Sequence, residues 1–459
     1  MSNRQGTLKT LSKSVRGNRA VSVATVFCSM AEVVFEIVIP ICMSNLLDKG
    51  IQSGDMSAVW RYGAELLGLA ALAMTTGILA ARIGARASVG LAANLREDMY
   101  RNVQTFSFSN IDKFSTSSIV TRLTTDVTNV QNAYQMMLRI AVRGPAMLVF
   151  AMIVSFRISP DISRIFLIAI PVLGIPLALI SKGVHPIFTK VFRTYDKLNN
   201  IVQENVRGIR VVKSFNQEQH EIDKFHSVSE DIRSNFTKAE KILAFNSPLM
   251  QLCMYTCMIL ISWFGAKAIV ASGNDAAIGL TTGNLTALST YATQILMSLM
   301  MLSMVFSMII ISQASARRIA EILNEKTDIS NPSSPVMEVK DGSIDFDHVD
   351  FVYASKADKK VLSNIDVHIK SGETIGIIGG TGSSKTSLVQ LIPRLYDVTG
   401  GSLSLGGVNV KDYSFDALYD KLGYVTQKAV LFSGTVRDNI LFGESAAGSD
   451  SENLESAIA

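Results

Sequence analysis

The most informative stretch of this chain reads Gly379-Gly380-Thr381-Gly382-Ser383-Ser384-Lys385-Thr386-Ser387. The apolar run Thr374–Ile378 precedes it and predicts a short buried strand, and residues 387–392 after it have helical spacing. A strand, a glycine-rich turn and a helix N-terminus form a P-loop, in which backbone N–H groups surround a phosphate. The alternative is a polar Gly/Ser loop that contains an incidental lysine.

Two residues of this stretch would carry the phosphate chemistry. In a P-loop, Lys385 reaches the terminal phosphates and the Thr386 hydroxyl holds Mg²⁺. The strict pattern G-x-x-x-x-G-K-[ST] fails at one position, because Ser384 stands where the second glycine belongs. Serine adds a Cβ and a hydroxyl close to the phosphates but still presents its N–H group. We therefore expect altered or weakened nucleotide handling, not its loss.

Upstream of this stretch, the chain is built from long apolar blocks. Hydrophobic residues make up 48% of the 459 residues, which is too apolar for an ordinary soluble α/β enzyme of this length. Six blocks each approach or exceed the roughly twenty residues that cross the hydrocarbon core of a bilayer. They are Ala20–Leu47, Val59–Ala81, Tyr134–Phe156, Ile162–Ile180, Leu243–Val270 and Leu285–Ile311. The sequence therefore predicts six transmembrane helices.

Charges beside these blocks predict the orientation. Residues 1–19 contain five basic residues and no acidic residue, which favours a cytoplasmic N-terminus. The connectors 82–133 and 181–242 are rich in charged residues and are expected on the same side. An even number of spans then leaves the P-loop in the cytoplasm, where ATP is present. The net charge of +4 is what such loops give on a membrane protein, so it does not indicate nucleic acid. We expect no nucleic-acid partner.

The two long connectors have helical patterns of their own. Residues 82–105 continue as a helix without proline, a break follows at residues 106–115, and the helical pattern resumes from Ile119. Residues 188–239 repeat this arrangement around residues 204–215. The pattern predicts helices that extend far beyond the bilayer and are joined by short transverse pieces, a geometry suited to transmitting force to a soluble domain. The alternative is a pair of solvated, charged hairpins.

Together with the P-loop, the order of several further motifs resembles half-transporters of the ATP-binding-cassette (ABC) exporter type. The matching pieces are Thr121–Val127, Glu204-Asn205 with Gly208–Phe215, Phe351-Val352-Tyr353, Gly423–Gln427 and Leu431–Val436. The resemblance covers about residues 20–459, and the segments Phe114–Ser118 and Leu138–Pro145 look most similar to bacterial heterodimeric multidrug exporters. It implies a polytopic membrane domain of six α-helices followed by a partial α/β P-loop nucleotide-binding domain.

The resemblance divides the chain into four parts. Residues 1–19 form a cytoplasmic segment, residues 20–323 the membrane domain with long intracellular helices, residues 324–336 a linker, and residues 337–459 the first half of a nucleotide-binding domain. The family's signature motif, second acidic strand, catalytic glutamate and switch histidine have no counterpart after Gln427. We therefore expect a fragment of a longer gene product that ends within a helix at residues 450–459 and does not hydrolyse ATP by itself.

The resemblance also implies roles for individual residues. Gly379–Ser387 resembles the phosphate cradle, with Lys385 acting in catalysis. Tyr353 is similar to the aromatic residue that stacks on adenine, the alternative being an ordinary strand tyrosine. Gln427 matches the glutamine that contacts Mg²⁺ and senses the γ-phosphate, and is the second residue expected to act in catalysis. Segments near Ile111–Ser117 and Gly208–Phe215 resemble the two coupling helices, and the second would dock on a partner's nucleotide domain.

The function implied by the resemblance is ATP-driven export of hydrophobic drug-like or lipid-like molecules across a bacterial cell membrane, with both termini cytoplasmic. Two half-transporters would close on ATP and switch the spans from inward- to outward-facing, and Ser384 favours a non-identical partner. Two alternatives stay open. The chain could be a weakly or non-hydrolysing regulatory half of a heterodimer, or part of a receptor or channel that uses nucleotide only as a ligand.

Residues inside the spans leave the transported molecule open. Methionines follow one face of the fifth and sixth spans, namely Met250, Met254, Met258, Met297, Met300, Met301, Met304 and Met308. Flexible thioethers suit varied apolar ligands, although packing between helices is the simpler interpretation. Glu32 and Glu36 are costly in lipid, so they either attract cationic molecules or bond to neighbouring helices. Arg139 and Arg143 are expected at the cytoplasmic headgroup level. Cys253 and Cys257 of the fifth span are expected to act as small apolar residues.

Overall fold

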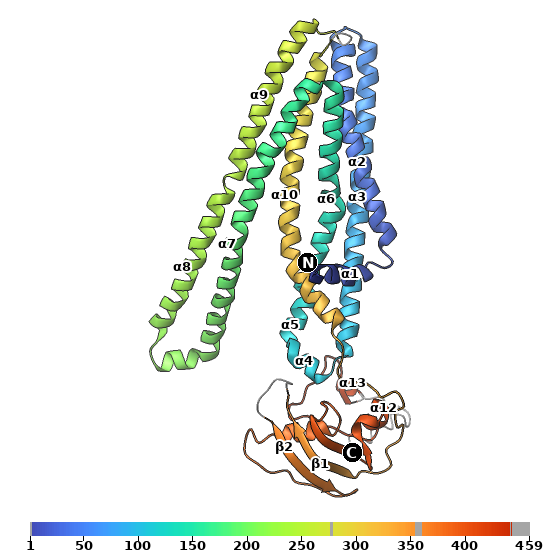
Figure 1. Cartoon of the computed structure of the whole chain (residues 1–459), viewed down its shortest axis with the longest axis vertical. Coiled ribbons are helices and arrows are strands. Elements are labelled where there is room, and N and C mark those ends of the chain that lie inside the picture. The colour runs from blue at the N-terminus through green and yellow to red at the C-terminus, as the bar shows by residue number, and fades with distance from the viewer. Residues whose placement is uncertain (1, 276–278, 354–359, 441, 443–459) are drawn as a thin grey trace. The chain divides into compact units, whose positions relative to one another are not determined.

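A computed structural model of the protein describes residues 2–275, 279–353, 360–440 and 442. The chain forms two compact units (Figure 1). Unit 1 contains residues 1–104 and 116–325, and unit 2 contains residues 105–115 and 326–459. The helix expected at residues 450–459 lies outside the described residues.

Unit 1 is built from helices. They are α1 (Ser2–Lys13), α2 (Arg19–Asn45), the π-helix η1 (Leu46–Ile51), α3 (Met56–Gln104), α5 (Thr116–Thr121), the π-helix η2 (Arg122–Asp126), α6 (Val127–Ile158), α7 (Pro160–Ser214), α8 (Glu218–Leu243), α9 (Asn246–Ser272) and α10 (Thr282–Asn324). Figure 1 shows α2, α3, α6 and α10 side by side, while α7 runs beside α8 and α9 in a second group. The two groups pack together along α6, α7, α9 and α10.

Among the described residues of unit 1, six helical segments are long and apolar enough to cross a membrane, which confirms the predicted spans. They are Arg19–Ile51, Met56–Gln104, Thr116–Ile158, Pro160–Ser214, Glu218–Ser272 and Thr282–Phe306. The charged connectors are confirmed as helical extensions, because α3 continues to Gln104 and α7 to Ser214. The piece expected around Gly208 is helical and continuous with α7, which ends at Ser214. A glycine destabilises a helix by only about 0.5–1 kcal/mol, which is too little to end a long one.

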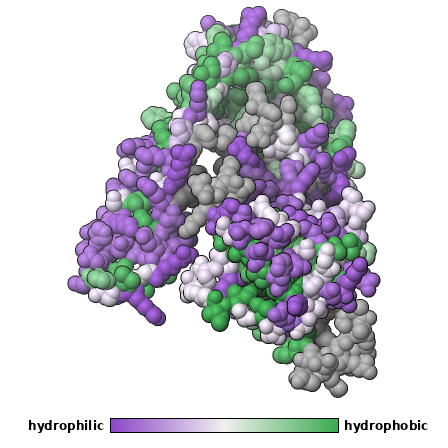
Figure 2. Space-filling model, turned by 60° about the horizontal axis from the view of Figure 1, so that its bottom comes forward, coloured by the Kyte–Doolittle hydropathy of each residue, from purple (hydrophilic) through white to green (hydrophobic). Residues whose placement is uncertain are grey.

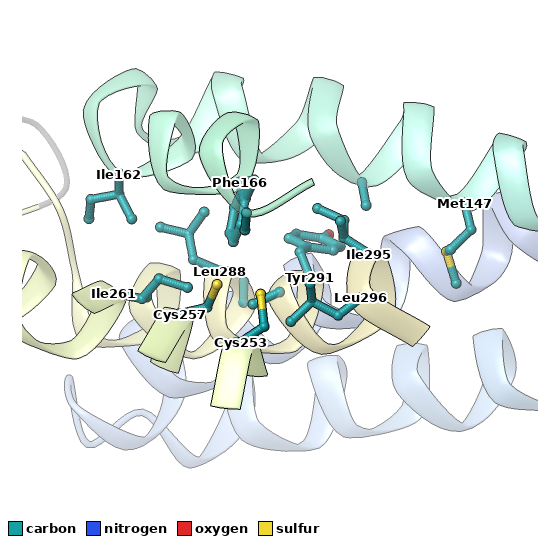
Figure 3. Close-up of a cluster of buried hydrophobic side chains, with 14 of the residues drawn as sticks. Met147, Ile162, Phe166, Cys253, Cys257, Ile261, Leu288, Tyr291, Ile295 and Leu296 are labelled. Atoms are coloured by element: carbon teal, nitrogen blue, oxygen red, sulfur yellow. The ribbon is translucent and has the colours of Figure 1, made fainter. Parts of the chain in front are cut away.

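The core of unit 1 lies where α2, α6, α7, α9 and α10 meet. Phe166 and Tyr291 are among its fully buried side chains (Figure 3). The Tyr291 hydroxyl donates a 2.6 Å hydrogen bond to the Ile37 carbonyl oxygen, so the polar end of this buried ring is satisfied. Cys253 and Cys257 belong to the same cluster, which confirms them as apolar core residues.

Beyond the apolar segments, charged side chains tie η2 to α10. The Asp126 carboxylate is fully buried and accepts hydrogen bonds from the Arg318 guanidinium, one of them 2.7 Å long. Arg122 donates to the Arg318 carbonyl oxygen at 2.7 Å and pairs with Glu321 at 3.0 Å. A buried carboxylate is unstable without such partners, so this network holds η2 and α10 in one arrangement.

Unit 2 contains a four-stranded antiparallel sheet in the order β2-β1-β3-β4. Its elements are α4 (Phe108–Phe114), β1 (Ile344–Phe351), β2 (Leu362–Ile369), α11 (Lys385–Leu391), β3 (Gly400–Leu405), β4 (Val408–Asn409), the 3-10 helix η3 (Val410–Asp412), α12 (Phe415–Tyr419) and α13 (Val436–Ile440). Phe346 of β1, Leu403 of β3 and Leu391 of α11 meet in its core. Although α4 lies between α3 and α5 in the sequence, it belongs to this unit.

The buried strand predicted at Thr374–Ile378 is wrong for this structure. These residues form no strand, and Ile378 is 97% exposed. A strand is stable only when neighbours satisfy its backbone groups and cover its side chains. The four strands that the structure describes pair only with one another. The apolar run therefore has no strand beside it in the described residues.

Candidate phosphate-binding site

The glycine-rich loop joins the exposed segment 373–380 to the N-terminus of α11. Gly382 has a φ of +83° and Ser384, the residue before α11, has a φ of +62°. Glycine adopts this left-handed conformation freely, whereas a residue with a Cβ is strained in it by about 1–2 kcal/mol. The departure from the strict motif therefore lies at a position whose backbone favours glycine.

Lys385 folds back over the loop. Its ammonium group donates hydrogen bonds to the carbonyl oxygens of Gly379 at 2.7 Å and Gly380 at 2.9 Å, and to the Ser383 hydroxyl at 3.2 Å. The charge is thus held at the loop by neutral acceptors, each of which binds an ammonium less strongly than a phosphate oxygen does. The Lys385 ammonium group therefore already lies at the loop that would bind a phosphate.

Tyr353 and the P-loop, predicted separately from the sequence, lie close together. The Tyr353 hydroxyl is 2.7 Å from the Ser387 hydroxyl and 3.3 Å from Gln390 Oε1, both on α11. Tyr353 as a whole is 43% exposed and lies beside the loop. Thr381 and Thr386 are also exposed, and Gln427 lies in an exposed bend. The structure therefore brings together Tyr353 and the loop.

The sequence patterns pointed neither to Tyr396 nor to its contact with Asp112. Tyr396 follows α11 and is 8% exposed, and its hydroxyl donates a 2.8 Å hydrogen bond to Asp112 of α4. Its ring stands edge-on to Tyr353, with ring centres 5.1 Å apart. No local pattern could have revealed this contact, since Tyr396 and Asp112 are 284 residues apart.

The N-terminus of α4 is held by the segment that follows α10. Ser107 caps the helix in a capping box with Asn110. The Asp328 carboxylate accepts hydrogen bonds from Ser107 and from Ser109, the latter at 2.6 Å, and Asn110 donates to the Lys326 carbonyl oxygen at 3.2 Å. Partial burial of Asp328 opposes the effect of these donors, but together they lower the pKa of its carboxyl group. The predicted break at residues 106–115 is thus a short, anchored helix.

Within the spans, Arg143 of α6 binds both glutamates of α2. Its guanidinium contacts Glu32 at 2.9 Å and Glu36 at 2.7 Å. Gly77 of α3 leaves room for Glu32, because a Cβ there would lie 3.0 Å from its carboxylate. Two acidic residues inside an apolar helix thus attract the arginine, and its depth in the membrane stays a prediction. Of the two alternatives for the glutamates, the structure shows the bond to a neighbouring helix.

The two methionine-rich faces differ. Met250 and Met254 of α9 pack against the core cluster, as the simpler interpretation predicts. Met297, Met300, Met301 and Met304 of α10 are instead 43–63% exposed in unit 1. Among the described residues of these two faces, the most exposed thioethers are therefore those of Met297, Met300, Met301 and Met304.

Two parts of the chain match ABC transporters. Residues 22–299 match the family described as the ABC transporter transmembrane region, and residues 362–459 match the family described as ABC transporter. The first match covers more than half of the chain. With six spans followed by a partial nucleotide-binding domain, the chain belongs to the ABC transporters and has the organisation of an exporter half-transporter.

Its relatives include several bacterial ABC proteins. The chain is 32% identical over 421 residues to the uncharacterized ABC transporter ATP-binding protein YfiB of Bacillus subtilis, covering 92% of this chain and 72% of that protein. It is 29% identical over 438 residues to the uncharacterized ABC transporter ATP-binding protein Rv1273c of Mycobacterium tuberculosis, covering 95% and 74%. It is 28% identical over 408 residues to an ATP-dependent lipid A-core flippase of Desulfotalea psychrophila, covering 88% and 69%.

The strain at Ser384 leads to a prediction. Ser384→Gly is expected to stabilise the loop and the start of α11 by about 1 kcal/mol, because glycine removes the Cβ that is unfavourable at positive φ. Hydrogen exchange of the α11 amides and thermal unfolding of the nucleotide domain measure this change. Ser384→Ala is the matched control, since it removes the hydroxyl but keeps the Cβ. Equal stabilisation in both variants would show that the hydroxyl, not the backbone, is the source of the effect.

Proposed function

We propose that this protein is one half of an ATP-driven exporter of hydrophobic small molecules that works by alternating access. The observation that supports this most directly is the membership of α4 in unit 2. The segment 105–115 connects two membrane-spanning helices, yet it is built into the same compact unit as the P-loop. A rearrangement around a bound nucleotide can therefore be transmitted to the membrane-spanning helices through the covalent chain.

The residues at the loop fit ATP with Mg²⁺. Gly379–Ser387 supplies backbone N–H groups at a helix N-terminus, Lys385 a cation, and Tyr353 an exposed ring for adenine. The described residues hold no cluster of three acidic, histidine or cysteine side chains that could bind a metal by themselves. Mg²⁺ suits such a site, because it binds through one or two protein groups together with the phosphates. We assign those groups to Thr386 and Gln427.

The tip of the α7–α8 hairpin is proposed to dock on the nucleotide domain of a second half-transporter. Hydrophilic residues dominate the surface of this hairpin, but hydrophobic ones interrupt them near its tip (Figure 2). Phe215 is 71% exposed and Val211 is 60% exposed. Because contiguous exposed apolar patches mark interaction sites, a partner is expected here. We favour a non-identical partner, since a second site with a standard P-loop would compensate for Ser384.

Crosslinking tests this arrangement. Phe215→Cys is expected to crosslink to a cysteine on the partner's nucleotide domain when the neighbouring half-transporter gene is co-expressed. Val270→Cys is the matched control, because Val270 is 83% exposed but lies near the end of α9, in a different helix from the tip residues. If the crosslinked species contains two copies of this chain, the heterodimer is wrong and the exporter proposal stands.

The transported molecule is proposed to be hydrophobic and to contact the methionine face of α10. Four exposed thioethers form an adaptable apolar surface, and one relative is named a lipid A-core flippase. The full-length protein and its partner, reconstituted in liposomes, should move fluorescent hydrophobic dyes or lipids only when Mg·ATP is present. Nucleotide binding without any ATP-dependent movement would instead support a receptor or channel.

A regulatory half-transporter is the second candidate, and the strained Ser384 favours it. In that case nearly all ATP hydrolysis by the pair would depend on the partner's P-loop. Comparing Lys385→Ala with the equivalent substitution in the partner distinguishes the two candidates. A regulatory role predicts that Lys385→Ala changes the rate only a fewfold, whereas the partner's substitution stops hydrolysis.

A further inference from the structure

Aromatic rings connect the P-loop helix to α4 inside unit 2. Tyr353, hydrogen-bonded to Ser387 of α11, stands edge-on to Tyr396. The Tyr396 ring also lies 5.6 Å from the ring of Phe351 and 6.0 Å from that of Phe108, the first residue of α4. Tilted and edge-to-face pairs at these separations are favourable contacts. Tyr396 therefore contacts both the tyrosine proposed to hold adenine and the start of α4.

A hydrogen bond also joins Tyr396 to α4. The Tyr396 hydroxyl donates to Asp112 Oδ2, one helical turn after Phe108. Burial of the ring and the neighbouring carboxylate raise the pKa of Tyr396, so the hydroxyl remains a donor at neutral pH. The two contacts together fix both the distance and the rotation of α4 relative to Tyr396.

We propose that Tyr396 is a positioning residue that transmits the state of the nucleotide site to α4, through its ring contact with Tyr353 and its hydrogen bond to Asp112. This inference rests on the proposed function and adds a residue-level route to it. An adenine seated on Tyr353 changes the position of that ring or its bond to Ser387. A shift of the Tyr353 ring towards Tyr396 displaces Tyr396, since close-packed rings cannot overlap. Its bond to Asp112 then moves α4, which joins α3 to α5.

The test compares two tyrosines of the same domain. Tyr396→Phe removes the bond to Asp112 but keeps the ring contacts. Tyr413→Phe is the matched control, because Tyr413 is also buried and its hydroxyl donates a 2.8 Å bond to the Leu405 carbonyl oxygen. Both variants are prepared in the full-length protein with its partner in liposomes. The measurements are the ATP dissociation constant, the ATPase rate, the amount of dye transported per ATP hydrolysed, and the unfolding temperature.

Tyr396→Phe is expected to lower the dye transported per ATP by about fivefold or more, the size of a typical coupling between sites. ATP affinity should change less than about twofold, and the unfolding temperature should fall no further than in Tyr413→Phe. Asp112→Ala should give the same loss, and combining it with Tyr396→Phe should add little, because both remove one interaction. Unchanged transport per ATP in Tyr396→Phe, or an equal loss in Tyr413→Phe, overturns the inference.

Lys385→Ala, measured in the same liposomes, separates this outcome from failure of the proposed function. If Lys385→Ala stops transport while Tyr396→Phe leaves the coupling ratio unchanged, only the role of Tyr396 is wrong. If transport does not depend on ATP at all, the proposed function itself fails.

Discussion

Lys385→Ala is expected to reduce ATP-dependent transport at least about 100-fold, a usual effect of removing a group that stabilises charge in a transition state. The ammonium group already lies at the loop, bonded to the Gly379 and Gly380 carbonyl oxygens, so it can exchange these neutral acceptors for phosphate oxygens. Membrane insertion should be unchanged, because it depends on the length of the apolar helices. Transport in liposomes and the amount of protein in the membrane measure the two effects separately.

Lys370→Ala is the matched control for this prediction. Lys370 is an exposed lysine that follows β2 in the same unit, away from the loop in sequence. Its substitution removes the same charge from the domain and should leave transport within about twofold, as surface substitutions usually do. Unchanged transport in Lys385→Ala would disprove the assignment of residues 379–387 as the phosphate site.

Arg143→Met is expected to destabilise the membrane domain by about 3 kcal/mol. The substitution keeps an unbranched apolar stem but leaves the Glu32 and Glu36 carboxylates, one helical turn apart, without their cation. Removing one member of a buried ion pair is costly because the remaining charge is neither solvated nor paired. Thermal unfolding in detergent and the yield of folded protein measure the loss.

The triple variant Arg143→Met, Glu32→Gln, Glu36→Gln serves as the control. It carries no charge at this site, so most of the lost stability should return. If the triple variant is as unstable as Arg143→Met, the arginine stem and not the ion pairs accounts for the effect. A triple variant that is stable but has lost transport of cationic dyes alone would show that these glutamates also attract cations.

The features that sequence alone determined are those whose physical cause is local. An apolar run long enough for a bilayer predicts a span regardless of its neighbours, and all six spans were found. The break after α3 and the continuing charged helices were likewise visible in composition and spacing. The loop at residues 379–387 was recognisable because its glycines, lysine and threonine are adjacent in the chain. Its roles in binding ATP and Mg²⁺ stay predictions.

Only the tertiary structure decided which distant groups meet. The sequence around Arg143 gave no sign of its partners, which lie 107 and 111 residues away on α2. The contact of Tyr396 with Asp112 is likewise tertiary, because the two residues are 284 positions apart in the chain. The strand predicted at Thr374–Ile378 is the opposite case, because the sequence pattern suggested an element that these residues do not form. A strand needs a neighbouring strand to satisfy its backbone, and no property of its own five residues can supply one.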